Sequence, residues 1–231
     1  MRCRWSDPSD FERGNIIRAA RKPTDPTTGT GHPVIYRSQL HRKTPNTMQS
    51  TTAIPPIRLR GVNLGGWLVL EKWMTPSLFE GLEATDETTW CAELGRDAPA
   101  RLRAHRDRFI TREDFAWLAS VGVNAVRLPI GHWVLGPPYP YHSKYGAARH
   151  PFVDGGIDVV DRALEWASEF GLRVLLDLHA APGCQNGFDN GGIKDVCECH
   201  TRDEYLAHSV DLLGRLAARY RAAPALHGIE V

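Results

Sequence analysis

The sequence has 231 residues, of which 42% are apolar and 24% charged, as expected for a globular protein with one domain and an appendage. The net charge of +1 gives no reason to expect nucleic acid or an anionic membrane as a partner. No apolar run approaches the roughly 20 residues of a membrane span, and the N-terminus lacks the apolar core of a signal peptide. By default, these features predict a cytoplasmic protein.

Residues 1–55 are predicted to be disordered, because prolines and polar residues interrupt every periodic pattern. The first 50 residues hold nine Lys or Arg against four Asp or Glu. They lack the dense basic runs and interleaved aromatics of a nucleic-acid-binding arm. A simpler hypothesis is that this stretch is not natural coding sequence and that translation starts at Met48. Peptides from residues 1–47 in the native protein would disprove it.

The first predicted elements lie between residues 57 and 110. Residues 57–63 alternate as in a strand and run into a glycine turn at residues 64–67. Residues 74–110 form a long irregular connection with a helical piece around residues 99–108. A connection of this length in a compact domain tends to be functional.

The rest of the chain alternates between helical and strand patterns. Two helices are predicted to start at capping boxes, Thr111–Asp114 and Thr201–Glu204, and glycines end two of the predicted helices. The predicted elements are a helix ending at Gly122, a strand at 124–130, a helix from Ile157 to Ala167 ending at Gly171, a strand at 173–178, a helix from Leu206 to Tyr220 and a strand at 226–231.

Strands that alternate with helices indicate a parallel sheet with right-handed crossovers, so the predicted fold class is α/β. This pattern does not separate a barrel from an open doubly wound sheet. A nucleotide site is not expected, because no Gly-x-Gly-x-x-Gly follows a strand and no Walker loop is present.

Polar residues at two strands are candidates for chemistry. Arg127 stands in an apolar strand, where it must be paired, either in a structural ion pair or in a site. His179 ends the buried strand 173–178 and is either a satisfied core residue or a site residue. Asp177 alternates with His179 and is predicted to point the same way.

Aromatic side chains also gather on or near the predicted strand ends, where they would contact a ligand or fill the core. They are Trp67, Trp73, Trp90, Trp133, Tyr139, Tyr141 and Phe188.

The five cysteines imply no disulfide framework. The cluster Cys197-Glu-Cys199-His200 lacks the two-residue spacing and the second ligand pair of a structural zinc site. The favoured interpretation is a polar loop before a helix, with no metal and no cofactor.

Four linked motifs resemble the exo-β-1,3-glucanase (glucan 1,3-β-glucosidase) branch of glycoside hydrolase family 5, and they cover roughly residues 57–231. They are Arg60-Gly-Val-Asn-Leu-Gly-Gly-Trp67, Met74-Thr-Pro-Ser-Leu-Phe79, Val126-Arg-Leu-Pro-Ile-Gly131, and Leu176-Asp-Leu-His-Ala-Ala-Pro-Gly183 running into Gln185-Asn-Gly-Phe-Asp-Asn190. The resemblance implies that residues 56–231 form the N-terminal half of a (β/α)8 TIM barrel, truncated after about four strands.

The same resemblance implies retaining hydrolysis of β-glucans by two glutamates whose carboxyl groups lie about 5–5.5 Å apart. The acid/base is expected just past Val231, in an Asn-Glu-Pro motif, and Glu230 belongs to the strand before it. The nucleophile is also missing. The chain is therefore expected to lack the C-terminal half of the barrel and to be inactive alone. The alternative is a non-catalytic β-glucan-binding module.

The remaining site residues are also implied by the resemblance. Arg127 matches the arginine that supports the nucleophile, and His179 matches a histidine of the glucose subsite. Glu71 and Asn190 match residues that hydrogen-bond the non-reducing-end glucose, and Phe188 matches an aromatic at the leaving-group side. Two departures from the family pattern, His132 for an aromatic and Cys184 for a small polar residue, are not expected to be damaging.

Overall fold

The computed structural model describes residues 58–140, 152–153 and 155–231. The predicted disordered extension at residues 1–55, the proposed start at Met48 and the aromatic Tyr141 lie outside these residues. None of the helices in the described residues is long and apolar enough to cross a membrane.

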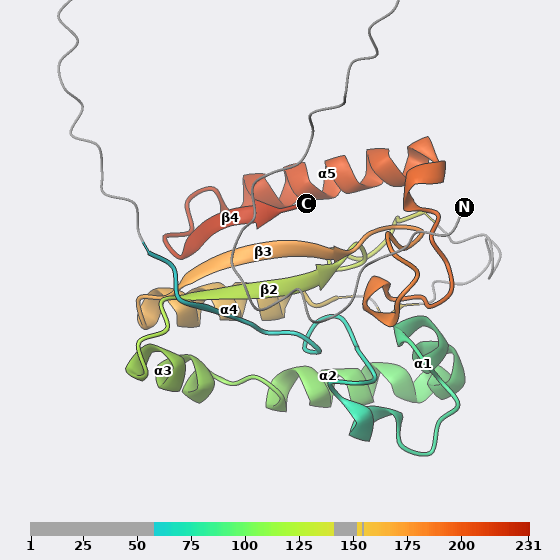
Figure 1. Ribbon diagram of the computed structural model, residues 1–231, viewed down its shortest axis with the longest axis horizontal. Coiled ribbons are helices and arrows are strands. Elements are labelled where there is room, and N and C mark those ends of the chain that lie inside the picture. Colours follow the sequence, from blue (N-terminus) through green and yellow to red (C-terminus); the bar gives the residue numbers. More distant parts are fainter. Residues whose placement is uncertain (1–57, 141–151, 154) are drawn as a thin grey trace, which may run out of the picture. The chain divides into compact units, whose positions relative to one another are not determined.

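The described residues form a four-stranded parallel sheet in the order β1-β2-β3-β4 (Figure 1). The strands are β1 (Gly61–Asn63), β2 (Ala125–Gly131), β3 (Arg173–Ala180) and β4 (Leu226–Glu230). The predicted α/β class and parallel pairing are confirmed. Because all four strands are parallel, their carboxyl ends lie along the same edge of the sheet.

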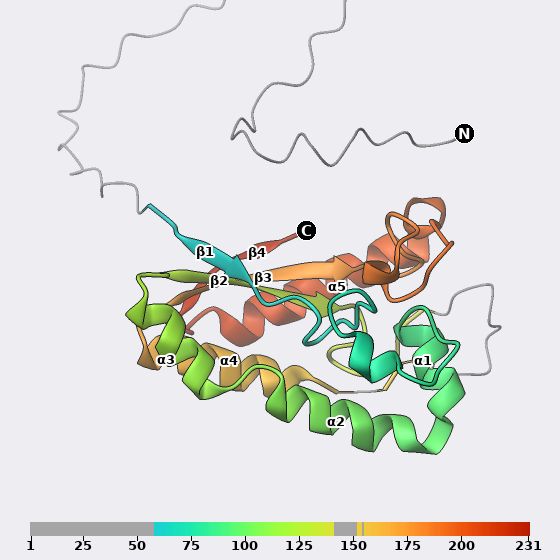
Figure 2. The same ribbon diagram turned by 60° about the horizontal axis from the view of Figure 1, so that its bottom comes forward.

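Helices α3 (Arg112–Ser120), α4 (Ile157–Glu169) and α5 (Asp203–Tyr220) connect successive strands and lie on one side of the sheet (Figure 2). The connection between β1 and β2 also holds α1 (Glu87–Leu94), α2 (Ala98–Arg108) and the 3-10 turns η2 (Pro76–Phe79) and η3 (Gly95–Asp97). Two further 3-10 turns, η5 (Asp189–Gly191) and η6 (Cys199–Thr201), lie between β3 and α5.

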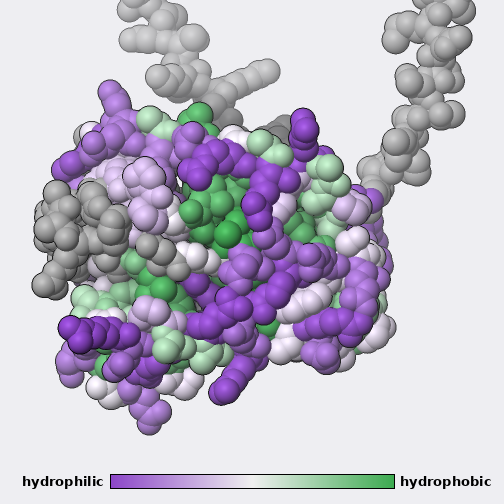
Figure 3. Space-filling model, turned by 180° about the vertical axis from the view of Figure 1, so that it is seen from behind, coloured by the Kyte–Doolittle hydropathy of each residue, from purple (hydrophilic) through white to green (hydrophobic). Residues whose placement is uncertain are grey.

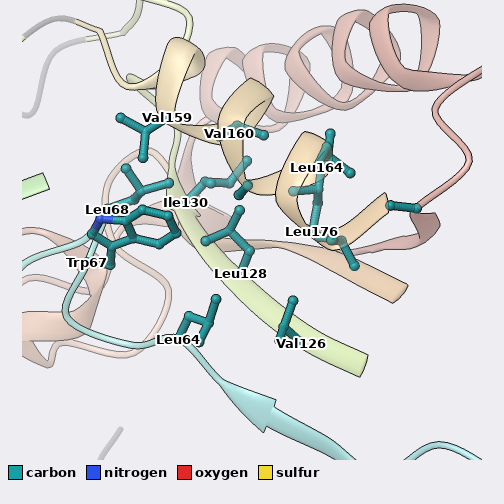
Figure 4. Packing of buried hydrophobic residues seen from close by; sticks show 14 of the residues in the cluster. Leu64, Trp67, Leu68, Val126, Leu128, Ile130, Val159, Val160, Leu164 and Leu176 are labelled. Carbon is teal, nitrogen blue, oxygen red and sulfur yellow. The ribbon is translucent and has the colours of Figure 1, made fainter. Parts of the chain in front are cut away.

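The main core lies between the sheet and these helices. Alternate residues of β2 and β3 point toward the helices, because side chains of a strand alternate between its two faces. Figure 4 shows strand residues such as Val126, Leu128 and Leu176 packed against Val160 and Leu164 of α4. The opposite face of the sheet is therefore left to Arg127, Asp177 and their neighbours.

Trp67 closes one end of this core (Figure 4). Its side chain is fully buried, its indole N–H donates to the carbonyl of Arg106 at 2.9 Å, and its ring stacks on Trp166 at 6.4 Å between centroids. The segment after β1 is thereby tied to α2 and α4.

Large apolar side chains also remain at the surface of the described part. Figure 3 shows apolar residues between hydrophilic ones on the face opposite to Figure 1. The most exposed of the large ones are Val231, Trp73, Val210, Trp117 and Phe188.

The first predicted strand is shorter than expected. The predicted range is residues 57–63; residue 57 lies outside the described residues, and from residue 58 on the strand begins only at Gly61. The Arg60 N–H donates to the side-chain oxygen of Asn124 at 2.7 Å, while the Arg60 carbonyl accepts the N–H groups of Asn124 and Ala125. The N–H of Arg60 is therefore bonded to a side chain instead of to the backbone of a neighbouring strand.

The capping box predicted at Thr111–Asp114 is confirmed, since Asp114 accepts hydrogen bonds from the N–H and hydroxyl of Thr111 at 2.7 and 3.0 Å. The one predicted at Thr201–Glu204 is wrong. Helix α5 begins at Asp203, and the Thr201 hydroxyl donates backward to the carbonyl of Glu198 at 2.8 Å. Glu204 instead lies 3.2 Å from the guanidinium of Arg202.

Candidate functional site

Arg127 of β2 contacts one side chain from each of the other three strands. Its Nε and Nη2 donate to the two carboxylate oxygens of Glu230 at 2.8 and 3.1 Å, and its Nη1 donates to the side-chain oxygen of Asn63 at 3.0 Å. Its Nη2 also lies 2.7 Å from Oδ2 of Asp177. The predicted pairing of Arg127 is confirmed, and the pairing partners lie on β1, β3 and β4.

The pairing of Arg127 with Glu230 shifts the pKa of both groups. Hydrogen bonding to Arg127 lowers the pKa of Glu230 below its usual value, and the same bond raises the pKa of Arg127. The carboxylates of Asp177 and Glu71 also raise the pKa of Arg127, so Glu71 lies within electrostatic reach of the guanidinium. Glu230 therefore stays ionised and is poorly suited to donate a proton.

His179 lies beside this network and extends it toward the loop after β3. Its Nδ1 lies 2.8 Å from Oδ2 of Asp177, which confirms that the two side chains share a face. Its Nε2 lies 3.3 Å from the side-chain nitrogen of Asn190, whose oxygen accepts from Asn186 at 3.0 Å. His179 thus lies between a carboxylate on β3 and an amide of the following loop, and these two contacts fix the position of its ring.

Glu71 is held by the loop after β1. Its side chain is 6% exposed, and its carboxylate accepts the indole N–H of Trp73 at 3.0 Å. The next residue, Lys72, donates its N–H to Asp189 at 3.2 Å, beside Asn190. The loops that bear Glu71 and Asn190 are thus bonded to each other.

Only part of the predicted aromatic set can touch a ligand. Trp67, Trp90 and Trp133 are buried to within 1%, and Tyr139 is also buried, so these four fill the core. Trp73 and Phe188 are 72% and 61% exposed. They remain as surfaces on which a sugar ring can stack.

His132 fits its environment as an aromatic ring. It is buried, and it makes edge contacts with Trp133, Tyr139 and Phe152 at 5.1–5.5 Å between centroids. Burial lowers its pKa to about 3, with a smaller contribution from His208. His132 is therefore neutral and replaces the more usual aromatic without adding a charge.

The loop between β3 and α5 is built tightly around Cys184. This side chain is fully buried and its sulfur accepts the N–H of Gly187 at 3.3 Å. A methyl group at residue 191 would overlap that sulfur. Because Phe188 and Asn190 lie between these two positions, the contact shapes the candidate site.

Gly191→Ala is accordingly expected to lower the free energy of unfolding by about 1–3 kcal/mol, because overpacking forces a shift of backbone or sulfur. Urea denaturation followed by tryptophan fluorescence measures the change. Adding Cys184→Ala should recover most of the loss.

The matched control for this variant is Gly214→Ala in α5, where an added Cβ meets nothing within 4 Å. It is expected to raise the free energy of unfolding by up to about 1 kcal/mol, through helix propensity. A Gly191→Ala variant as stable as the wild type would contradict the packing described for the loop.

The cluster Cys197-Glu-Cys199-His200 runs into the 3-10 turn η6. Among the described residues, no group of three or more His, Cys, Asp or Glu side chains is arranged to hold a metal ion.

Comparison with known proteins finds relatives for most of the sequence. A probable glucan 1,3-beta-glucosidase A of Aspergillus clavatus is 47% identical over 165 residues, 70% of this chain. A glucan 1,3-beta-glucosidase of Blumeria graminis is 45% identical over 168 residues, 71% of this chain. The resemblance of the sequence to glucan 1,3-beta-glucosidases is thus confirmed over about 70% of this chain. It spans 37% of the length of each of these two relatives.

The solved structures show the same fold. The rutinosidase of Aspergillus niger superposes with a TM-score of 0.62 at 20% identity, over 73% of this chain and 47% of that one. The four strands and the helices that connect them thus correspond to about half of a TIM barrel, as predicted. No family model matches the sequence.

Sequence reasoning missed all three partners of Arg127 and one of Glu71. Asn63, Asp177 and Glu230 were not chosen as partners of Arg127, although each lies at or near the end of a predicted strand. Trp73 was noted only as an aromatic, and its N–H bond to Glu71 has no signal in the sequence beyond spacing. Because the carboxyl ends of parallel strands meet at one edge, polar residues there could have been grouped with Arg127.

Proposed function

We propose that the protein to which these residues belong hydrolyses β-1,3-linked glucan or a related β-glucoside with retention of configuration, and that the described residues bind the sugar. The observation that carries this proposal is the cluster of Arg127, Asp177, His179 and Asn190 at the strand ends. It offers donors and acceptors in fixed positions, as reading sugar hydroxyls requires. The names of the relatives support the choice of glucan.

Each candidate residue has a definite part in this proposal. His179, oriented by Asp177, and Asn190 bind hydroxyls from one side of the ring, and Glu71 binds them from the loop after β1. Phe188 offers an exposed ring for stacking on the leaving-group side. Arg127 keeps a neighbouring carboxylate ionised through its positive charge.

We further propose that the 231 residues alone do not hydrolyse glucan. The two carboxylates nearest the cluster centre, Asp177 and Glu230, are both paired with Arg127. Retaining hydrolysis needs one carboxyl group free to attack and a second one that carries a proton. This arrangement also favours the second candidate function, a module that binds β-glucan without cleaving it.

Calorimetric titration of the chain with laminaribiose tests the binding part. Binding is expected, and His179→Ala should weaken it about fivefold, since one hydrogen bond contributes about 1 kcal/mol. Arg215→Ala, in an exposed pair with Asp211 on α5, is the matched control and should bind as the wild type does.

Release of glucose from laminarin by the same preparation tests the catalytic part. No release above the buffer rate is expected from the chain alone, and measurable turnover would refute the assignment of Asp177 and Glu230 to structural pairs. Failure of the wild type to bind laminaribiose would refute the proposed sugar site.

A further inference from the structure

The first turn of α1 bonds to both loops of the candidate site. The carboxylate of Glu87 accepts the N–H of Leu70 at 2.8 Å, immediately before Glu71. The N–H and hydroxyl of Thr88 donate to the carbonyl of Gly192 at 3.0 and 2.7 Å. Two consecutive residues of one helix therefore hold the segment of Glu71 and the segment that follows Asn190.

A second contact repeats this link. Asp86, which caps α1, accepts the N–H of Lys194 at 2.9 Å as well as the N–H of Thr89 at 2.7 Å. Leu70 is itself fully buried. Because these hydrogen bonds are direct, a shift of the first turn of α1 would move both loops with it.

Glu87 is an unusual residue for this position, because its side chain is fully buried. Its Oε2 accepts from Leu70, while its Oε1 has no hydrogen-bond partner. The polar and titratable groups that surround the Glu87 carboxylate come from three places. They are Arg106 of α2, the indole of Trp133, and Asp86 and Cys91, which cap and belong to α1 itself. The carboxylate is thus removed from water, which is costly for an ionised group even with Arg106 nearby.

Burial raises the pKa of Glu87 to about 7. Arg106, the Leu70 N–H and Trp133 pull in the opposite direction, and Asp86 adds to the rise. Glu87 is thus neutral in mildly acidic solution and ionised in mildly alkaline solution. The charged form binds an N–H more strongly than the neutral form does.

We propose that Glu87 is a positioning residue for the sugar site, and that the gain or loss of one proton on its carboxyl group changes how firmly Leu70, and with it Glu71, is held. This inference rests on the proposed function, since Glu71 matters here as a sugar ligand. In the ionised state the bond to Leu70 is charge-assisted and fixes the Glu71 segment. In the protonated state that bond weakens and the segment moves more freely.

The contact itself is tested without sugar. The chain is labelled with 15N-leucine, and the amide resonance of Leu70 is followed by NMR from pH 5 to pH 9. A single-proton transition with its midpoint near pH 7 is expected in the wild type and absent in Glu87→Gln. Glu93→Gln, the same substitution at an exposed position of α1, should keep the transition. A Leu70 amide that does not titrate, or that titrates equally in Glu87→Gln, overturns the inference.

The link to the sugar is tested by laminaribiose titrations at pH 5.5 and pH 8.5. The wild type is expected to bind several-fold more tightly at pH 8.5, and Glu87→Gln should lose most of that difference. Equal wild-type affinity at both pH values overturns the positioning role and leaves the proposed function intact. No binding at either pH, with a Leu70 amide that titrates, overturns the proposed function while the proton-linked contact stands.

Discussion

Arg127→Leu is expected to lower the free energy of unfolding by about 3–5 kcal/mol, because it leaves a buried carboxylate without its cation. The side chain of Asp177 is 5% exposed, and Arg127 lies 2.7 Å from it. His179 remains as its neighbour, with Nδ1 2.8 Å from Oδ2 of Asp177. Most of the expected loss therefore comes from Asp177, and less from the half-exposed Glu230. Urea denaturation followed by tryptophan fluorescence measures the change.

A double-mutant cycle with Asp177→Asn separates this cost from the loss of packing. The double variant should lose less free energy of unfolding than the two single variants lose together. The difference is expected to be about 1 kcal/mol or more, since the two residues are in contact. Arg215→Ala, whose partner Asp211 lies 3.6 Å away on the surface, should change stability by less than about 1 kcal/mol. Additive effects of the two core variants would show that the Arg127–Asp177 pair is not coupled.

The network around Arg127 explains why four strands suffice to form a defined polar cluster. Each strand contributes one member, namely Asn63, Arg127, Asp177 and Glu230. Parallel pairing puts Asn63 in register with Arg127 and Asp177 in register with Glu230, and the second pair lies two residues further along the strands, within reach of the long Arg127 side chain. The side chains that the resemblance assigns to sugar binding lie around this cluster and depend on it for their orientation.

Much of this arrangement could be predicted from the sequence, because it follows from periodicity and from the cost of burying charge. The apolar strands around Arg127 and Asp177 were recognisable, and an arginine inside such a strand had to be paired. The alternation of strands and helices also predicted the parallel order. Each of these inferences needs only residues close together in the chain.

Three features of the described residues were missed or misread from the sequence. Helix α1 was read as irregular chain, although Asp86 three residues before Thr89 is an N-terminal cap signal. The burial of Trp67, Trp90 and Trp133 was not separable from ligand contact, since aromatics serve both purposes. The capping pattern at Thr201 was misleading, because the 3-10 turn η6 satisfied that threonine locally.

Glu87→Gln is expected to change the pH dependence of stability. The folded-state pKa of Glu87, about 7, lies above its ordinary value of 4.5. A group with a raised pKa contributes stability that is fully present below its unfolded value and is lost as the pH rises through its folded value. The wild type should therefore lose about 2–3 kcal/mol between pH 5 and pH 8 through this group alone. Glutamine cannot ionise, so the variant should escape that loss.

The measurement is urea denaturation of the wild type and Glu87→Gln at several pH values from 5 to 8. Taking the difference between the two proteins removes the titration of every group that they share. The variant should gain stability relative to the wild type steadily across this range, even if it is less stable at pH 5. Glu93→Gln, exposed on the same helix, should show a constant difference from the wild type. A constant difference for Glu87→Gln as well would mean that Glu87 keeps one protonation state in the folded protein. That result would contradict both the pH dependence of stability and the proton-linked hydrogen bond to Leu70.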